Sequence, residues 1–135
     1  MPNEFNTKII EEFRANEGRV GPPFQGAPMV LLTTTGAKSG QPHTTPLVPL
    51  LEDGHVYVIA SMGGAPKHPA WYFNVRANPH VTVEQGTEKY EADARILEGK
   101  ERDEAYALQT ARLPSFGEYQ QKTTRRIPVI ELVRR

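Results

Sequence analysis

The chain has 135 residues, of which 38% are hydrophobic and 24% charged, and its 16 Lys and Arg residues balance 16 Asp and Glu residues. We expect one globular domain over residues 1–135, because this length can bury its own core. A net charge of zero gives no overall field that attracts nucleic acid, so no nucleic-acid partner is expected. The absence of Cys excludes disulfides and thiol nucleophiles, and it suits a cytoplasmic protein.

The first segment predicts a helix over about residues 4–16. Phe5, Ile9 and Phe13 recur every four residues and therefore share one helical face. Asn3 is a suitable N-cap, and Gly18 follows the last turn. This face packs on the core or makes peripheral contact with a membrane or partner. The segment lacks the basic and apolar regions of a signal peptide, and no apolar run reaches the roughly 20 residues of a membrane span.

Runs of β-branched and alternating residues predict about six strands. They cover residues 29–35, 44–52, 55–61, 80–86, 88–97 and 127–133. Pro46 and Pro49 mark the second run as an edge or bulged strand, because proline has no N–H to donate. Asp53 and Gly54 predict a tight hairpin turn after it.

Helices are predicted at residues 70–78, 98–113 and 114–123. In the second of these, Ala105, Leu108 and Arg112 follow one another at helical spacing. The short connections between strands indicate mostly antiparallel pairing. The expected fold class is therefore mainly β with flanking helices, in the form of a small barrel.

The stretch "TTTGAKSGQPHTTPL" (33–47) combines turn-forming residues with possible anion ligands. Gly36 and Gly40 allow tight turns and expose backbone N–H groups, and Lys38 adds a positive charge between them. Hydroxyl donors are supplied by Ser39, Thr44 and Thr45. The glycine spacing differs from known nucleotide-binding motifs. A plain hairpin turn and a phosphate cradle both remain open for this stretch.

A second glycine-rich loop, "ASMGGAPKHPAWYFN" (60–74), has similar chemistry. Gly63 and Gly64 permit close approach of the backbone to a ligand. Lys67 and His68 precede a helix start, where free N–H groups favour an anion. Both loops flank the ends of neighbouring strands, so we expect them to converge.

The segment "RLPSFGEYQQKTTRRIPV" (112–129) could line one side of a cavity with Phe116 and Tyr119. Arg125 and Arg126 are expected to be solvated. The His residues show no metal-ligand spacing, and Ser61 lacks the context of a serine hydrolase, so we expect no metal site and no serine nucleophile. Redox chemistry would then require a cofactor that brings its own reactivity.

Three segments in this order resemble one family. "TTTGAKSGQPHTTPL", "IASMGGAPKHPAWYFNVRANPHVTV" and "PSFGEYQQKTTRRIPVIEL" are similar to the deazaflavin-dependent nitroreductases, actinobacterial oxidoreductases that use reduced coenzyme F420. The resemblance covers most of the chain, from about Val30 to Leu132. It implies a split β-barrel like that of FMN-binding flavoreductases, and coenzyme F420 (F420H2 when reduced) as the cofactor.

The resemblance also implies a set of site residues. Lys38, Ser39 and the stretch from His43 would meet the F420 phosphate and side chain, whereas Ile59 to Met62 would lie along the deazaflavin ring. The implied cofactor-binding residues are Lys38, Ser39, His43, Thr44, Thr45, Pro46, Leu47, Val48, Ile59, Ala60, Ser61, Met62, Gly63, Lys67, Ala70, Trp71, Tyr72 and Asn74.

Catalytic and substrate-binding residues are implied in the same way. Ser61 is the expected polar group beside the ring, and Tyr119 the expected proton donor or substrate contact. Leu113, Phe116 and Tyr119 would form the substrate pocket. Ala37 and His43 stand where relatives commonly carry arginine, and Phe116 cannot donate a hydrogen bond.

The implied function is an F420H2-dependent reductase that transfers a hydride to an electron-poor acceptor, such as a quinone, an enone or an activated unsaturated lactone. Two alternatives remain at this point: an FMN-dependent oxidoreductase of the same fold, and a non-catalytic protein that binds F420 or a lipophile. The expected partner is a small-molecule hydride acceptor. We expect a cytoplasmic monomer or homodimer, with peripheral membrane contact as a further expectation.

Overall fold

The computed structural model describes residues 4–20, 28–61 and 64–135. The elements follow one another as α1 (Glu4–Ala15), β1 (Val30–Thr35), β2 (Pro42–Leu47), β3 (Leu50–Glu52), β4 (His55–Ile59), α2 (Ala70–Ala77), β5 (His80–Gln85), β6 (Glu88–Ile96), α3 (Gly99–Arg112), α4 (Ser115–Gln121) and β7 (Val129–Arg134). None of the helices in these residues is long and apolar enough to cross a bilayer.

All seven strands of the described chain belong to one sheet. Their order is β2-β1-β5-β6-β7-β4-β3, and every neighbouring pair is antiparallel. The predicted class, mainly β with flanking helices in a split barrel, is confirmed. The strand count is one higher than expected because residues 44–52 form two strands instead of one.

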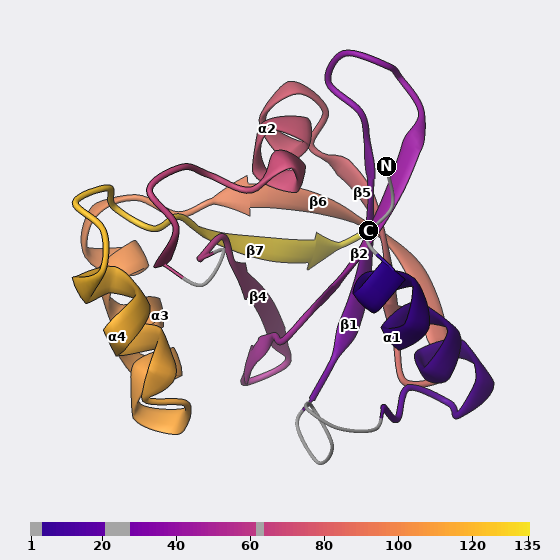
Figure 1. Cartoon of the computed structure of the whole chain (residues 1–135), viewed down its shortest axis with the longest axis horizontal. Helices are drawn as coiled ribbons and strands as arrows, with labels where there is room; N and C mark the ends of the chain where they lie inside the picture. Colours follow the sequence, from indigo (N-terminus) through magenta and orange to yellow (C-terminus); the bar gives the residue numbers. More distant parts are fainter. Residues whose placement is uncertain (1–3, 21–27, 62–63) are drawn as a thin grey trace.

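The break within residues 44–52 explains how the sheet curls. β2 and β3 lie at opposite ends of the strand order, although only Val48 and Pro49 separate them in the chain. Two residues span only about 7 Å, so the two edges of the sheet must come near each other. The sheet therefore curves into a half-barrel (Figure 1). Pro49 cannot donate to a strand ladder, which suits this crossing point.

The tight turn between β3 and β4 forms where the sequence predicts it. Asp53 and Gly54 both have positive φ angles, 47° and 80°. Two consecutive left-handed residues are typical of the two-residue hairpin turn that matches the twist of antiparallel strands. Asp–Gly is a favoured pair for this turn, so the local sequence sets the register of the hairpin.

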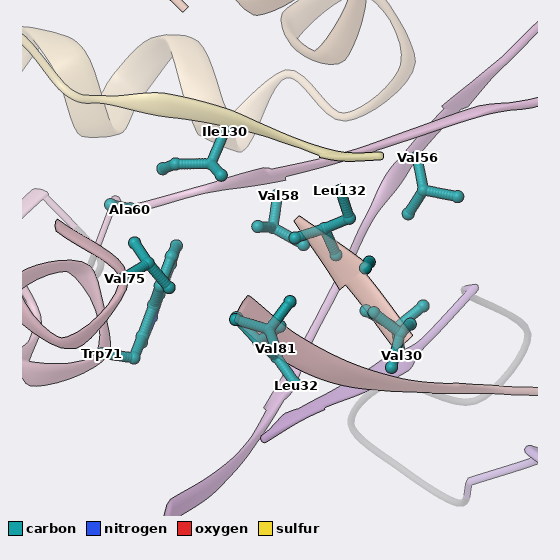
Figure 2. Close-up of a cluster of buried hydrophobic side chains, with 12 residues drawn as sticks. Val30, Leu32, Val56, Val58, Ala60, Trp71, Val75, Val81, Ile130 and Leu132 are labelled. Atoms are coloured by element: carbon teal, nitrogen blue, oxygen red, sulfur yellow. The ribbon is translucent and has the colours of Figure 1, made fainter. Parts of the chain in front are cut away.

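Alternate residues of the strands point into the curled sheet and form the main core. This inner cluster contains Val30 and Leu32 of β1, Val56 and Val58 of β4, and Ile130 and Leu132 of β7, among others. Figure 2 shows these side chains together with Trp71 and Val75, which α2 inserts from one end. α2 therefore closes that end of the half-barrel.

Helices cover the outer face of the sheet with two smaller cores. α1 buries Ile9 and Phe13 against Leu31 of β1, which confirms the predicted stripe for these two residues. The Phe5 side chain lies outside the described part of the chain. On the other side, α3 and α4 cover an outer cluster made of Leu50, Ile59, Leu97, Ala105, Tyr106, Phe116, Ile127 and Val129.

The buried face of α3 differs from the expected one. Leu108 is 41% exposed, whereas the buried residues are Arg102, Ala105, Tyr106 and Gln109. Their spacing is still helical, but two of the four are polar, so an apolar stripe could not reveal this face. The Arg102 guanidinium is held by the backbone oxygen of Ile127, at 2.7 and 2.9 Å.

Glu131 of β7 is a buried carboxylate on the outer face, with only 6% exposure. Its two oxygens accept hydrogen bonds from Arg95, at 2.6 Å, and pair with His55 Nδ1, also at 2.6 Å. Burial alone would raise the pKa of Glu131, but the hydrogen bonds from Arg95 and His55 lower it overall. This network ties β4, β6 and β7 together.

Candidate functional site

The β1–β2 hairpin loop is closed by its own hydrogen bonds. The Gly36 N–H donates to the Gln41 oxygen at 2.8 Å, and the Gly40 N–H donates to the Gly36 oxygen at 3.0 Å. The Ser39 hydroxyl accepts from the Gln41 N–H at 3.2 Å and lies 3.4 Å from His43 Nε2. A side chain on Gly36 would collide with both, so the loop requires glycine there. Lys38 is left exposed at its tip.

The two predicted loops converge through Asn74 of α2. Its Oδ1 accepts a hydrogen bond from the Ala37 N–H at 3.0 Å, and its Nδ2 donates to the Thr34 hydroxyl at 3.1 Å. The Thr34 side chain is almost fully buried, with 1% exposure. In Figure 1 the hairpin loop and α2 lie at the same end of the molecule. A single amide thus fixes the position of the hairpin relative to the helix.

Arg125 organises the loop that follows β4. It donates hydrogen bonds to the backbone oxygens of Ala60 at 3.1 Å, Ser61 at 2.8 Å and Ala65 at 2.9 Å. The expectation that Arg125 is solvated is wrong, because its side chain is partly buried and burial lowers its pKa. No local pattern marks this residue, since its partners are about 60 residues away in the chain. Arg126, by contrast, is exposed as expected.

His68 is the fourth contact of Arg125. The guanidinium lies 3.1 Å from His68 Nδ1, and the imidazole packs against the ring of Tyr72 at 4.6 Å. Burial lowers the pKa of His68, and the charges of Arg125 and Arg76 lower it further. An arginine can only donate, so Nδ1 accepts and the neutral ring carries its hydrogen on Nε2.

The predicted catalytic residues Ser61 and Tyr119 lie on adjoining segments. The Gly64 N–H donates to the Ser61 oxygen at 2.9 Å. A Cβ on Gly64 would lie 2.8 Å from the Tyr119 oxygen, and its φ of +85° also favours glycine. The loop therefore packs directly on the backbone of α4. The Ser61 side chain itself is 9% exposed.

The predicted substrate-pocket residues belong partly to the outer core. Phe116 is only 9% exposed, and its ring packs edge-on against that of Tyr119 at 5.2 Å. Leu113 and Tyr119 are partly buried against the same cluster. Phe116 therefore supports Tyr119 from beneath, and Tyr119 and Leu113 are the residues of this group with more exposed surface.

The other predicted cofactor-binding residues differ in how deeply they are buried and in which core they belong to. Ala60 and Trp71 are buried in the inner core, Leu47 and Tyr72 pack at its edge, and Ile59 is buried in the outer core. Val48 packs beside α1. Met62 and Gly63 lie outside the described residues. Exposed or partly exposed positions are His43, Thr44, Thr45, Pro46, Lys67 and Ala70.

Three exposed cations without a carboxylate partner in the described chain lie on or beside the two loops. Among the described residues, Lys38, Lys67 and Arg76 are exposed and form no ion pair with a carboxylate. The sequence explains why, since it contains no Asp or Glu over residues 18–51 and 54–83. This acid-free composition is a sequence signal that sets these two loops apart. It produces a locally positive surface on a chain whose net charge is zero.

The sequence matches the family model of the F420H2-dependent quinone reductases over residues 7–133. An F420H2-dependent quinone reductase of Mycobacterium tuberculosis is 39% identical over 128 residues, which cover 91% of this chain and 85% of the relative.

Solved structures agree with this match. A structure of an F420-H2 dependent reductase, FDR-A, is 49% identical with a TM-score of 0.72 and covers 78% of this chain and 93% of that one. Another structure, described as a domain-swapped dimer, has the same identity and TM-score and covers 78% of this chain and 79% of that one. The haem storage protein HutZ of Vibrio cholerae is 16% identical with a TM-score of 0.62, covers 93% of this chain and 87% of that one, and shares the fold alone.

Proposed function

The chain belongs to the F420H2-dependent quinone reductase family, and on this premise we propose that its reductase site lies where the β1–β2 hairpin, the loop after β4 and α2 meet. The protein is an F420-dependent oxidoreductase. Bound F420H2 supplies the hydride, and a quinone is the acceptor class that the family name specifies. The observation that carries the location is the group of unpaired cations around these loops.

The chemistry of these residues fits the cofactor. The F420 tail carries a phosphodiester and carboxylates, and Lys38, Lys67 and Arg76 have no carboxylate of the described chain to neutralise them. Each can therefore pair with a ligand anion without first breaking an internal ion pair. Lys38 and Lys67 are proposed to hold the tail. Arg76 adds a guanidinium charge, which neither Ala37 nor His43 carries.

The remaining roles follow from position. Ser61 lies at the end of β4 and is proposed to contact the deazaflavin ring, while Tyr119 and Leu113 are proposed to contact the acceptor. Trp71 is buried in the inner core and Phe116 in the outer core, and Phe116 packs against Tyr119. Holding ring and acceptor in contact in a dry site is the main contribution a protein makes to hydride transfer.

A charge-reversal experiment tests the location. We expect Lys38→Glu to weaken F420 binding at least tenfold in a fluorescence-quenching titration, because it replaces an attraction with a repulsion. Lys89→Glu is the matched control, since Lys89 is also exposed and without an ion pair but lies on β6, outside the site. Equal affinities of the two variants would contradict the proposed location.

Activity assays separate the alternatives. Anaerobic F420H2 oxidation is followed by absorbance with a panel of quinones, enones and unsaturated lactones, and we expect quinones to be reduced. A yellow purified protein that binds FMN and ignores F420 would favour the FMN-dependent alternative. F420 binding without reduction of any acceptor would favour the non-catalytic one.

We propose a cytoplasmic location with peripheral membrane contact, which would bring the site to lipid-soluble quinones. Phe73 supports this, because it is 45% exposed on α2 beside His68. Phe73→Ser should reduce sedimentation of the protein with quinone-containing vesicles. Unchanged sedimentation would contradict a role for Phe73.

We also propose a homodimer over the alternative monomer, because β2 and β3 leave sheet edges unpaired and a relative is described as a domain-swapped dimer. Light scattering that gives the monomer mass at all concentrations would contradict the dimer.

A further inference from the structure

Arg125 directs four of its five guanidinium N–H groups to one loop. Its Nε and both terminal nitrogens donate to the oxygens of Ala60, Ser61 and Ala65, and one terminal nitrogen also faces His68. No carboxylate of the described chain pairs with it. Arg95 and Arg112, which also bridge distant elements, each pair with a Glu.

Few other hydrogen bonds hold the described residues of this loop in their conformation. Between β4 and α2 it is neither helix nor strand over most of its described residues. The Ala60 N–H is bonded to the Pro128 oxygen at 3.0 Å, and the Gly64 N–H to the Ser61 oxygen at 2.9 Å. Arg125 is the only side chain that the described contacts show bonded to three of its carbonyls. A charged donor that satisfies three backbone oxygens fixes their directions as well as their positions.

We propose that Arg125 is a positioning residue of the cofactor site, which holds Ala60, Ser61, Ala65 and His68 in the conformation that receives the deazaflavin ring. The inference rests on the proposed function, because it takes that loop to be the ring-binding segment. Arg125 acts through Ser61 and His68 and touches no reacting atom. Four of its five N–H groups are already bonded to residues of this loop, so its main role is to hold the loop.

His68 gives the proposal a second consequence. With Nδ1 occupied by Arg125, the imidazole presents an N–H at Nε2. Tyr72 and Phe73 pack against this ring, and Arg76 is the other cation that affects it. Arg125 thus sets the tautomer of a histidine beside the site as well as the path of the loop.

Substitution of Arg125, with Arg126 as the matched control, tests the inference. Arg126 is the adjacent arginine, but it bonds to Gly99 and Asp103 of α3 and reaches no loop residue. We expect Arg125→Met to weaken F420 binding about tenfold or more, because a loop in the competent conformation a tenth of the time raises the apparent Kd by that factor. Arg126→Met should stay within about twofold of wild type.

Arg125→Lys separates charge from geometry. It keeps the positive charge but not the three-carbonyl contact, so we expect it to weaken F420 binding nearly as much as Arg125→Met. Nitrogen NMR of His68 gives a readout independent of the cofactor: wild type should show the Nε2–H tautomer with a hydrogen-bonded Nδ1, and both variants should shift the Nδ1 resonance because that hydrogen bond is lost or changed. Wild-type affinity together with an unchanged His68 spectrum in Arg125→Lys would overturn the inference.

The free wild-type protein supplies a test that needs no variant to fold. Backbone order parameters of Ala60, Ser61, Ala65 and His68 should be as high without F420 as with it, because Arg125 has already ordered the loop. A loop that becomes ordered only when F420 is added would overturn the inference. If wild type binds no F420 at all, the proposed function fails instead, and the NMR results still decide the role of Arg125.

Discussion

Substitutions of Asn74 distinguish its contribution to the stability of the fold from the effect of charge at this position on F420 binding. Asn74→Ala removes the hydrogen bonds to the Ala37 N–H and the Thr34 hydroxyl, at 3.0 and 3.1 Å. A neutral hydrogen bond contributes about 1 kcal/mol, and the loss is greater when a buried group is left without a partner. Thr34 is such a group, whereas the Ala37 N–H can bond to water. We therefore expect a loss of about 2 kcal/mol and a fall in Tm of about 6 °C.

Asn74→Asp should behave differently. The carboxylate still accepts from the Ala37 N–H, and the Thr34 hydroxyl can turn and donate to it. Stability should therefore stay within about 0.5 kcal/mol of wild type. The new negative charge, however, enters an acid-free part of the chain. Two like charges separated by about 8 Å at a protein surface repel each other by about 0.5–1 kcal/mol, so a bound anion at that range would be held about two- to sixfold more weakly.

Urea unfolding and an F420 fluorescence titration measure the two effects on the same samples. Thr34→Val, which removes one of the two bonds and keeps the shape, should lose about 1 kcal/mol. If Asn74→Asp unfolds as easily as Asn74→Ala, or if it binds F420 as tightly as wild type, the assignment of the two roles is wrong.

Three further predictions concern other parts of the scaffold. Trp71→Ala should cost about 3–5 kcal/mol in urea unfolding, because it empties the end of the inner core that α2 closes; a loss under 1 kcal/mol would contradict that packing. Gly64→Ala should destabilise by about 1–3 kcal/mol, and by more than Gly40→Ala, because both positions have positive φ but only Gly64 meets the backbone of α4. Glu131→Gln should cost about 1–3 kcal/mol at pH 7 through its weakened bond to Arg95. It should also flatten the acid-induced loss of stability: a carboxylate with a lowered pKa stabilises the fold above its unfolded value near 4.5, and that stability is lost as the pH falls through the folded pKa. Equal acid sensitivity of variant and wild type would show that Glu131 is not responsible.

Local patterns in the sequence predict most of the elements because the physics of each element is local. The spacing of Ile9 and Phe13, the Asp53–Gly54 turn and the alternation in residues 80–97 all depend on neighbours within a few positions. The division of residues 44–52 could not be read this way. Whether Val48 and Pro49 continue a strand or cross to another edge depends on the closure of the whole sheet.

In the candidate site, too, only the local features could be predicted from the sequence. The glycine and lysine positions of both loops are visible in the sequence. The reason expected for their convergence is wrong, because β4 is not a neighbour of β1 or β2 in the sheet; the contact is made by Asn74 of α2 with the hairpin loop. Arg125 is different, because its partners are about 60 residues away and its chemistry resembles that of any surface arginine. Leu108 fails for a related reason: Arg102 lies on the buried face because the Ile127 oxygen and the Gln120 side chain, from other elements, satisfy its guanidinium. Gln109 is buried beside it, and its amide nitrogen has no hydrogen-bond partner among the described residues.

The place of β7 in the sheet has a consequence for biosynthesis. β7 is the latest of the seven strands in the chain, yet it pairs with β6 on one side and β4 on the other. While the ribosome still holds residues 129–134, the β3–β4 hairpin has no neighbour through which to join the other strands. Arg125 lies four residues before β7 and reaches the loop after β4 only when these strands meet. Ordering of the loop after β4 is therefore coupled to completion of the sheet, and if this loop receives the cofactor as proposed, we expect a nascent chain to gain affinity for F420 only as β7 docks.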